Sequence, residues 1–253
     1  MKISIAVLAY NRPNHLKRVI DAILKQKIKL INVYIDGPAD KKILDNQKKI
    51  FKLLKNYKSK ILINLTKQPK NNGLAFSVTN AVTSELKNND AVILLEDDCV
   101  PLNGFFNYMF NGLKKYRSSK NVRSICSYNN LETKSDEAFF LKRFNPWGWA
   151  TWKDRWKKHN FEIKNTITQI KNNGTIDSLP LDLKSYSENS EIINGKQDIW
   201  SLSWTLTHYL DSSLILYPSR SYIENIGFDG TGVHCSSTNI FKINNKNKKC
   251  TLP

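Results

Sequence analysis

The chain has 253 residues, with 39 Lys and Arg against 22 Asp and Glu, which gives a formal net charge of +17. Its 40% hydrophobic and 11% aromatic residues are enough for a folded core, so a disordered chain is excluded. No apolar run approaches the roughly 18 residues of a membrane span. The N-terminal run stops at Asn11-Arg12-Pro13 without a signal-peptide cleavage site. The four cysteines stand far apart, so we expect no disulfide framework, no structural zinc site and a reducing, cytoplasmic compartment.

The positive charge does not predict a nucleic-acid-binding protein. Only seven of the basic residues are Arg, the residue type that base readout and bidentate phosphate recognition favour, and the lysines are spread along the whole chain. The lysines of residues 48–55 fit the solvated outer face of a helix. The alternative is that this charge attracts an anionic partner, such as a phospholipid surface or a nucleotide.

The first hundred residues predict four strands that alternate with three helices. Residues 2–9 predict a buried first strand, and residues 91–95 form a continuous apolar run, as expected of a strand covered on both faces. Pro13 suits the first turn of a helix, where its missing N–H costs little. The other predicted elements are helices at about 13–26, 40–58 and 74–87, and strands at 30–36 and 61–65.

This alternation predicts an α/β fold with a doubly wound, mostly parallel sheet, in which ligands bind at the carboxyl ends of the strands. Polar residues follow three of the predicted strands, namely Asn11-Arg12, Asp36-Gly37 and Glu96-Asp97-Asp98. We therefore expect a ligand site at this edge of the sheet. No glycine-rich dinucleotide motif or P-loop motif occurs in the sequence.

The acidic triplet is the sharpest local feature. Adjacent carboxylates repel one another, so three of them at a strand end favour a bound cation. Two carboxylates and a diphosphate supply the oxygen ligands that Mn²⁺ or Mg²⁺ prefers. The alternative is a solvated acidic turn.

Asp36 and Asn72 each have a structural and a functional interpretation. Asp36 either shapes an Asp-Gly turn or binds a ribose or a base edge. Asn72 either caps the helix that follows or marks a helix N-terminus whose N–H groups bind a nucleotide.

The second half of the chain contains all six tryptophans. Trp147 and Trp149 are expected to divide between a role in the core and a role in stacking against a sugar. Residues 172–195 are poor in apolar side chains and predict a mobile surface segment, after which a helix runs from about Asp198 to Asp211 and residues 214–218 form a strand.

Taken together, these motifs resemble the donor-binding half of GT-A-fold nucleotide-sugar glycosyltransferases. The resemblance continues through Trp147-Gly148-Trp149, Asp198-Ile199-Trp200 and Gly232-Val233-His234, in the order of the N-acetylglucosaminyltransferase I-like branch and of related bacterial surface-polysaccharide transferases. It covers roughly residues 3–235. The implied fold is a single compact domain of the Rossmann-like GT-A type. It would comprise a donor-binding half (residues 1–100), an acceptor-binding and catalytic half (101–235) and a flexible tail (236–253).

The resemblance also implies roles for individual residues. Asp98 would hold the metal, with His234 as a second ligand, and Asp198 would be the general base, with Asp154 and Asp211 as rivals. Desolvation by the neighbouring tryptophans would raise the pKa of such a base. The remaining donor-binding candidates are Asn11, Arg12, Asp36, Asn72, Glu96, Asp97 and Trp149, with Arg143 and Arg220 as candidates for contact with the pyrophosphate.

The implied activity is a metal-dependent, inverting transfer of GlcNAc or a related hexose from a UDP-sugar. The acceptor would be a hydroxyl of a glycan or a lipid-linked saccharide in surface-polysaccharide synthesis, reached by a cytoplasmic protein at an anionic inner membrane face. A sugar nucleotidyltransferase is the alternative, although it would need a glycine-rich basic loop after the first strand, which residues 10–13 lack. A basic nucleic-acid-binding protein is the least favoured interpretation.

Overall fold

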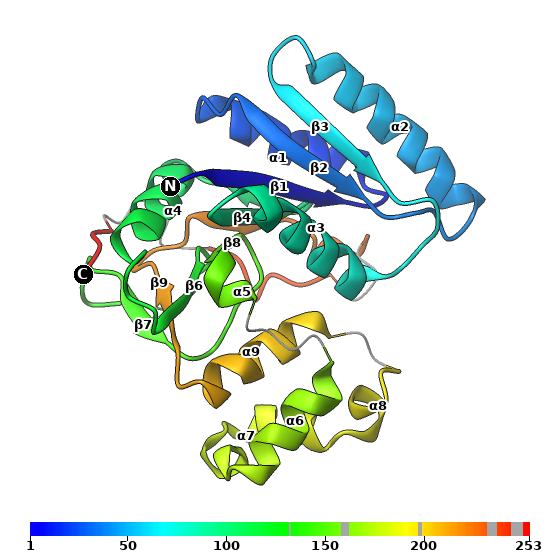
Figure 1. The fold of residues 1–253 in the computed structure, drawn as a ribbon. Coiled ribbons are helices and arrows are strands. Elements are labelled where there is room, and N and C mark those ends of the chain that lie inside the picture. The colour runs from blue at the N-terminus through cyan, green and yellow to red at the C-terminus, as the bar shows by residue number, and fades with distance from the viewer. Residues whose placement is uncertain (132, 158–161, 197–198, 232–236, 244–249) are drawn as a thin grey trace.

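The computed structural model describes residues 1–131, 133–157, 162–196, 199–231, 237–243 and 250–253. A large mixed sheet with helices on both faces forms the centre of the molecule (Figure 1). The strands of this sheet are β1 (Ile3–Ala9), β2 (Leu30–Ile35), β3 (Leu62–Lys67), β4 (Ala91–Glu96), β6 (Val122–Cys126), β7 (Phe139–Leu141), β8 (Trp149–Trp152) and β9 (Leu214–Tyr217). The helices are α1 (Pro13–Lys25), α2 (Lys41–Tyr57), α3 (Leu74–Asn88), α4 (Phe105–Lys115), α5 (Lys153–Trp156), α6 (Ile163–Asn172), α7 (Leu181–Glu188), α8 (Ser190–Ile193) and α9 (Trp200–Leu210).

The predicted parallel half of the sheet is confirmed. Strands β3, β2, β1 and β4 are neighbours in that order and all run parallel, so their carboxyl ends share one edge. Pro13 is at the start of α1, and the side chain of Asp40 caps α2 by accepting a hydrogen bond from the N–H of Ile43 at 2.8 Å.

The second half completes the sheet in mixed orientation. The order continues β4-β8-β6-β9-β7, with β8 antiparallel to both of its neighbours and β9 parallel to β6. A separate pair of antiparallel strands, β5 (Cys99–Pro101) and β10 (Ile223–Asn225), lies just beyond the end of β4.

Each face of the sheet is covered by its own apolar layer. Residues of α1, α2 and α4 pack on one face with Ile93 and Leu95. Residues of α3 and α9 pack on the other face with Val92 and Leu94. Strand β4 is therefore buried on both faces, as its continuous apolar run predicted.

Residues 172–195, predicted as a mobile surface segment, are mostly exposed but form helices. This segment contains a short 3₁₀ helix, η1 (Thr175–Ser178), and the helices α7 and α8. Together with α6 and α9 they enclose a small apolar cluster whose members are Ile167, Ile170, Leu179, Leu183, Ile192, Leu202 and Leu206. In Figure 1 these helices form a group that α9 separates from the sheet. Three apolar residues of the segment, Leu179, Leu183 and Ile192, are buried, whereas Leu181 is exposed.

The expectation of a frayed tail is wrong for residues 250–253. The N–H of Thr251 donates to the carbonyl of Asp136 at 2.9 Å, and the hydroxyl of Tyr116 donates to the carbonyl of Pro253 at 2.7 Å. None of the described helices combines the length and the apolar character that a membrane crossing requires.

Candidate functional site

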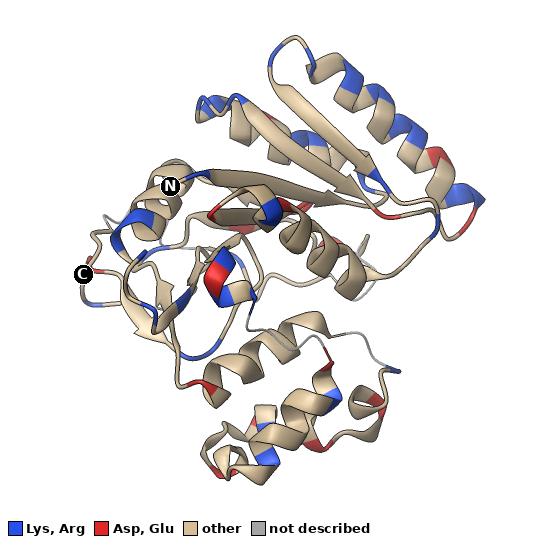
Figure 2. Ribbon diagram, viewed as in Figure 1, with Lys and Arg blue, Asp and Glu red and all other residues tan. Residues whose placement is uncertain are grey.

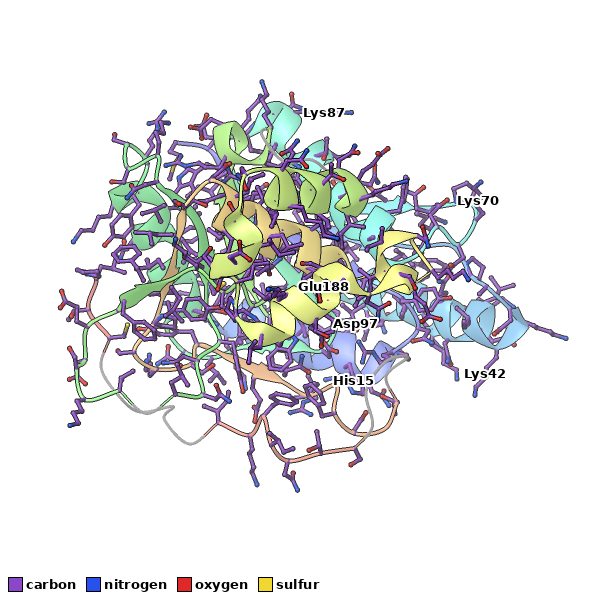
Figure 3. The ribbon with its side chains drawn as sticks, turned by 90° about the horizontal axis from the view of Figure 1, so that it is seen from below. His15, Lys42, Lys70, Lys87, Asp97 and Glu188 are labelled. Atoms are coloured by element: carbon purple, nitrogen blue, oxygen red, sulfur yellow. The ribbon has the colours of Figure 1, made fainter. Side chains whose placement is uncertain are left out.

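The acidic triplet stands at the carboxyl end of β4. Glu96 is the last residue of the strand and shares the α3-facing side with Leu94, because side chains alternate along a strand. Asp97 and Asp98 follow and are buried, with 3% and 9% of their surface exposed. Figure 3 places Asp97 inside the molecule, whereas Lys42 and Lys87 lie at its periphery. Three adjacent carboxylates in this setting require positive charge nearby.

Arg12 supplies part of that charge from the loop after β1. Its Nη2 lies 2.5 Å from Oδ1 of Asp97 and 2.9 Å from Oδ2 of Asp98, and its Nε donates to Asp97 at 3.1 Å. The backbone N–H of Tyr10 donates a further hydrogen bond to Asp97 at 3.2 Å. Burial opposes the charged form of Arg12, but the two carboxylates raise the pKa of the guanidinium above its usual value. The loop after β1 is thus tied to the end of β4.

One positive charge does not balance three carboxylates. Burial, together with the charges of Asp98 and Asp97, raises the pKa of Glu96 to about 8. Burial also raises the pKa of Asp97, although Arg12 opposes that rise. Among the described residues, no side chain or backbone group donates a hydrogen bond to the Glu96 carboxylate. Oδ1 of Asp98 is contacted at 3.4 Å by the thiol of Cys99.

These available oxygens have the chemistry that a hard divalent cation such as Mn²⁺ or Mg²⁺ prefers. No group of three or more His, Cys, Asp and Glu side chains in the described part of the chain is placed to hold a metal ion. A cation at Asp98 would need ligands besides the described carboxylates, and the oxygens of a bound diphosphate are of the kind that it prefers.

Asp36 anchors the loop that leads into α3. Its Oδ1 accepts hydrogen bonds from the N–H groups of Gly37 and Asn72 at 2.8 and 3.0 Å, and its Oδ2 accepts one from Gly73 at 2.9 Å. A Cβ at Gly37 would lie 2.1 Å from the carbonyl carbon of Lys70, so only glycine allows this close approach of the two loops. The structure thus gives Asp36 a structural role at the predicted site edge, because both of its oxygens are engaged by backbone groups.

Asn72 does not cap α3. The residue that precedes the helix is Gly73, with φ +85°, which has no side chain with which to cap the helix. The Asn72 side chain instead donates to the carbonyl of Lys70 at 3.0 Å. Its neighbour Asn71 donates to the hydroxyl of Tyr10 at 2.9 Å, which connects this loop to the one after β1. Asn11 lies on the loop after β1 and is half-buried. Within the described residues its side chain has no hydrogen-bond partner.

A third loop reaches the acidic triplet from the second half of the chain. The N–H of Ile226, directly after β10, donates to the carbonyl of Asp98 at 2.9 Å. Gly227 follows and faces the carboxylate of Asp98. Nε2 of His15 on α1 lies 3.1 Å from Oδ2 of Asp229, which holds the loop against α1. His15 was not singled out from the sequence, because only the folded chain brings it to Asp229.

The tryptophan-rich segment lies in the core. Trp149 is fully buried, and its ring packs against aromatic side chains of α5, α9 and the segment before β8. Of the two roles that the sequence allowed for Trp149, packing in the core or stacking against a sugar, the structure places it in the core. Trp147 is half-buried and packs edge-to-face against Tyr128 and Phe241.

Two of the predicted catalytic and metal-binding residues, Asp198 and His234, lie outside the described residues. The rivals of Asp198 as general base, Asp154 and Asp211, form ion pairs away from the acidic triplet. Asp154 pairs with Lys120 at 2.5 Å and with Arg155 at 3.0 Å, and the N–H of its neighbour Lys153 donates to the carbonyl of Asp90, just before β4 begins. Asp154 therefore lies at the end of β4 opposite to Asp98.

Asp211 and the two arginines are also engaged away from the triplet. Asp211 pairs with Arg123 on β6. Arg143 pairs with Asp182 of α7 at 2.5 Å, and Arg220 donates to the carbonyl of Asn103 at 3.1 Å.

No protein-family model and no curated protein sequence matches this chain. Three of the similar solved structures are enzymes that act on nucleotides or sugars. One is a mannosyltransferase of Pyrobaculum calidifontis in complex with GDP-Man and Mn²⁺ (12% identity, TM-score 0.46), aligned over 87% of this chain and 58% of its own length. Another is a 4-diphosphocytidyl-2C-methyl-D-erythritol synthase of Anaerococcus prevotii (11% identity, TM-score 0.45), aligned over 88% of this chain and 92% of its own. The third is mouse xyloside xylosyltransferase 1 (8% identity, TM-score 0.43), aligned over 84% of each chain. Likenesses at this level do not establish an activity, so the α/β fold described above rests on the strand order of the chain itself.

Proposed function

We propose that this protein is a glycosyltransferase that moves a sugar, GlcNAc or a related hexose, from a UDP-sugar to a hydroxyl group. The acceptor is a glycan or a lipid-linked saccharide in surface-polysaccharide synthesis. The observation that carries the proposal is the contact of the acidic triplet with the loop after β1, which Tyr10 and Asn71 connect to the loop after β3, at the carboxyl edge of a parallel sheet. That edge is where α/β folds of this kind bind nucleotides.

In this proposal, the residues of the described loops contact different parts of the donor. Helix α3 begins directly after Gly73 at this edge, and the dipole of a helix N-terminus favours a negatively charged group such as a phosphate. Asp36 keeps this N-terminus in place, and the free amide of Asn11 is available to the nucleotide. Glu96 lies on the α3 side of the sheet, where it can accept a hydrogen bond from a sugar hydroxyl or a base N–H. Arg12 orients Asp97 and Asp98 and stands next to the position of the pyrophosphate.

A divalent ion bound at Asp98 would neutralise the charge that develops on the leaving UDP. His234 is the second protein ligand in this proposal. The chain itself prepares the site by holding the Asp98 carboxylate between Arg12 and the loop at Gly227.

Asp198 is the proposed general base, which takes the proton of the acceptor hydroxyl as that oxygen attacks C1 and inverts its configuration. The position of the rivals supports this choice. Hydrogen bonding to Lys120 and the charge of Arg155 outweigh burial and lower the pKa of Asp154, which makes it a poor base. Asp154 also lies the length of β4 from the triplet, about 17 Å at 3.3 Å per residue.

A donor screen tests the proposed activity. Release of nucleoside diphosphate is measured from UDP-, GDP- and dTDP-sugars in the presence of Mn²⁺, and we expect UDP-sugars to be hydrolysed or transferred preferentially. The alternative, a sugar nucleotidyltransferase, would instead release pyrophosphate from a nucleoside triphosphate and a sugar 1-phosphate. Pyrophosphate release without any diphosphate release would overturn the proposal in favour of that alternative.

The cytoplasmic face of a membrane is the proposed place of the lipid-linked acceptor. Lysines line the outer side of α2 (Figure 2), and each lysine near an anionic surface contributes about 1 kcal/mol of binding at low salt. The exchange of Lys52 and Lys55 for Gln should therefore weaken binding to phosphatidylserine vesicles more than tenfold, whereas the same exchange of Lys164 and Lys171 on α6 should not. Equal effects of both pairs would show that only net charge matters.

A further inference from the structure

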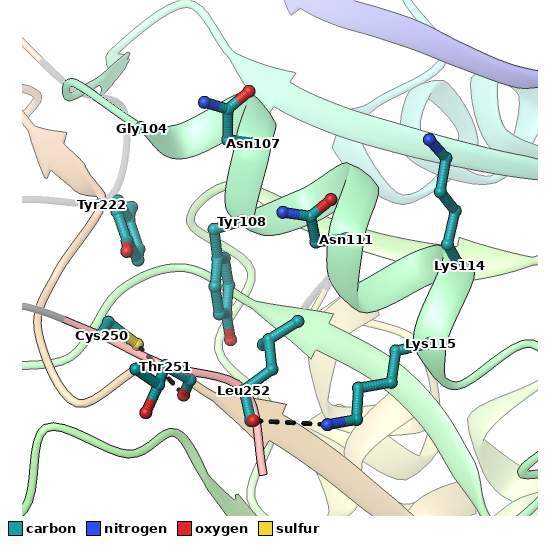
Figure 4. Close-up of a pocket in the computed structure, with 10 residues that line it drawn as sticks. All are labelled: Gly104, Asn107, Tyr108, Asn111, Lys114, Lys115, Tyr222, Cys250, Thr251 and Leu252. Atoms are coloured by element: carbon teal, nitrogen blue, oxygen red, sulfur yellow. Dashed lines mark hydrogen bonds between the residues drawn. The ribbon is translucent and has the colours of Figure 1, made fainter.

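A cavity lies on the outer side of α4, and none of its described lining residues belongs to the acidic triplet. It has a volume of about 720 Å³, within the range of small-molecule sites. Side chains of α4 form one wall, and Tyr222 and the C-terminal segment 250–252 form the others (Figure 4). The polar side chains along the cavity include Asn107, Tyr108, Asn111, Lys114, Lys115 and Tyr222.

Tyr108 presents a buried hydroxyl group without a partner. Only 5% of the residue is exposed, and within the described residues its oxygen makes no hydrogen bond. In Figure 4 the ring extends from α4 toward the C-terminal segment, so the hydroxyl lies at the end near Cys250 and Leu252. Burial raises the pKa of Tyr108 well above its usual value, so the group remains a hydrogen-bond donor. A ligand oxygen that accepts a hydrogen bond from this hydroxyl would remove the desolvation cost of leaving it unsatisfied.

The rim of the cavity is polar and positively charged. Asn107 and Asn111 are one helical turn apart on α4, and Lys114 and Lys115 occupy the next turn, so the groups form a row with a spacing of about 5.4 Å. Nζ of Lys115 donates to the carbonyl of Leu252 at 3.3 Å, which leaves Lys114 as the ammonium group with no protein partner in the described residues. None of the described residues that line the cavity is Asp or Glu. Amides and ammonium groups in this pattern suit a ligand with many hydroxyl groups and a negative charge.

The aromatic rings of the cavity are not available for stacking against a nucleobase. Tyr222 is stacked on Tyr108, with ring centroids 4.8 Å apart, and the guanidinium of Arg220 lies 4.2 Å from the centroid of the Tyr222 ring. Both rings therefore contribute their hydroxyl groups and edges.

We propose that this cavity is a binding site for an anionic saccharide, with Tyr108 and the two asparagines bonded to its hydroxyl groups and Lys114 paired with its carboxylate or phosphate. The site is separate from the acidic triplet. Strand β10 leads from Tyr222 to Ile226, whose N–H contacts Asp98, and these four steps span about 13 Å at 3.3 Å per residue. The proposal stands on the cavity alone and does not depend on the activity proposed above.

Calorimetric titration of the full chain tests the proposal. The probes are two acidic disaccharides, cellobiouronic acid and digalacturonic acid, with neutral cellobiose and inorganic phosphate as comparisons. We expect at least one acidic disaccharide to bind more than tenfold more tightly than cellobiose or phosphate. Absence of binding by both acidic disaccharides, or equal binding of cellobiose or of phosphate, would overturn the proposal.

Variants separate ligand binding from folding. Tyr108→Phe removes the hydroxyl group and keeps the stacked ring, so it should weaken the acidic disaccharide about tenfold without lowering the thermal unfolding midpoint. Tyr116→Phe is the matched control, because its hydroxyl is bonded to the carbonyl of Pro253, and it should lower the midpoint without affecting affinity. Lys114→Gln should weaken binding severalfold, and Lys87→Gln on α3 should not. Hydrolysis of UDP-sugar should be the same in Tyr108→Phe as in the unaltered protein. Unchanged affinity in both Tyr108→Phe and Lys114→Gln would contradict the assignment.

Discussion

A Cβ at Gly227 would lie 2.2 Å from Oδ2 of Asp98, which is closer than side-chain contacts allow. The loop after β10 therefore requires glycine at this position in order to pack against the acidic end of β4. Because the Gly227 backbone does not adopt a left-handed conformation, alanine itself causes no backbone strain there. Its methyl group acts only by displacing the Asp98 carboxylate or the loop.

Gly227→Ala should thus impair turnover far more than folding. Misplacement of a reacting group by about 1 Å can cost about 10² in rate, and we expect a loss of that size in UDP-sugar turnover. The control is Gly230→Ala in the same loop, where no atom lies within 4 Å of the added Cβ but φ is +83°. That variant should lower the urea midpoint slightly and keep its turnover. Normal turnover by Gly227→Ala would show that the Asp98 carboxylate need not stay where the structure places it.

Asp36→Ala should destabilise the protein. The carboxylate accepts hydrogen bonds from the backbone N–H groups of Gly37, Asn72 and Gly73, and its loss leaves donors in a partly buried loop without a partner. Hydrogen bonds to a charged group contribute about 1.5–3 kcal/mol, so we expect the free energy of unfolding in urea to fall by about 2–3 kcal/mol. Asp40→Ala removes only a helix cap and should cost about 1 kcal/mol. An equal or smaller loss in Asp36→Ala would mean that the loop does not depend on its anchor.

Asp198→Asn should slow transfer and leave donor binding intact. The amide keeps the shape of the side chain but cannot accept the proton, and loss of a general base costs about 10²–10⁴ in rate. The variant should also lose the acidic limb of the pH–rate profile, because the group that titrates there is absent. Asp154→Asn is the control and should leave transfer unchanged. If Asp154→Asn or Asp211→Asn abolished transfer while Asp198→Asn retained it, the base would have to be reassigned.

The described cysteines should differ in their reaction with iodoacetamide. Burial raises the pKa of Cys126 to about 12, and burial together with the charges of Asp98 and Glu96 raises that of Cys99. At pH 8 a thiol with that pKa is ionised in about one molecule in 10⁴. Half-buried Cys250 should therefore be alkylated in the native protein, and Cys99 and Cys126 only after unfolding. Peptide mass spectrometry distinguishes the sites, and rapid native alkylation of Cys126 would contradict the burial of β6.

The parallel half of the fold was predictable because its signals are local. The apolar run of residues 91–95, Pro13 at a helix start and the amphipathic pattern of residues 40–58 each need only neighbouring residues to be interpreted. The position of β8 in the sheet could not be predicted from neighbouring residues. It lies between β4 and β6 although Leu94 and its partner Trp149 are 55 positions apart in the numbering, and no short-range pattern predicts that pairing.

The candidate site, too, was predictable from local sequence only in part. The acidic triplet was evident from the sequence, since its composition is unusual by itself. Its pairing with Arg12 was not evident, because the two segments are about 85 residues apart and meet only where parallel strands end at one edge. The helices of residues 175–193 were missed for a related reason, since their few apolar side chains become a core only when α6 and α9 cover them.

The measurement that tests the central claim most directly is calorimetric titration of UDP into the protein with and without Mn²⁺, compared between the unaltered chain and Asp98→Ala. We expect the unaltered chain to bind UDP in the presence of Mn²⁺ and to lose most of that affinity in EDTA. Asp98→Ala should remain folded, as judged by circular dichroism and its unfolding midpoint, and should bind UDP equally weakly with and without Mn²⁺. Equal, Mn²⁺-dependent UDP binding by the unaltered chain and Asp98→Ala would contradict the assignment of the acidic end of β4 as the nucleotide-sugar site.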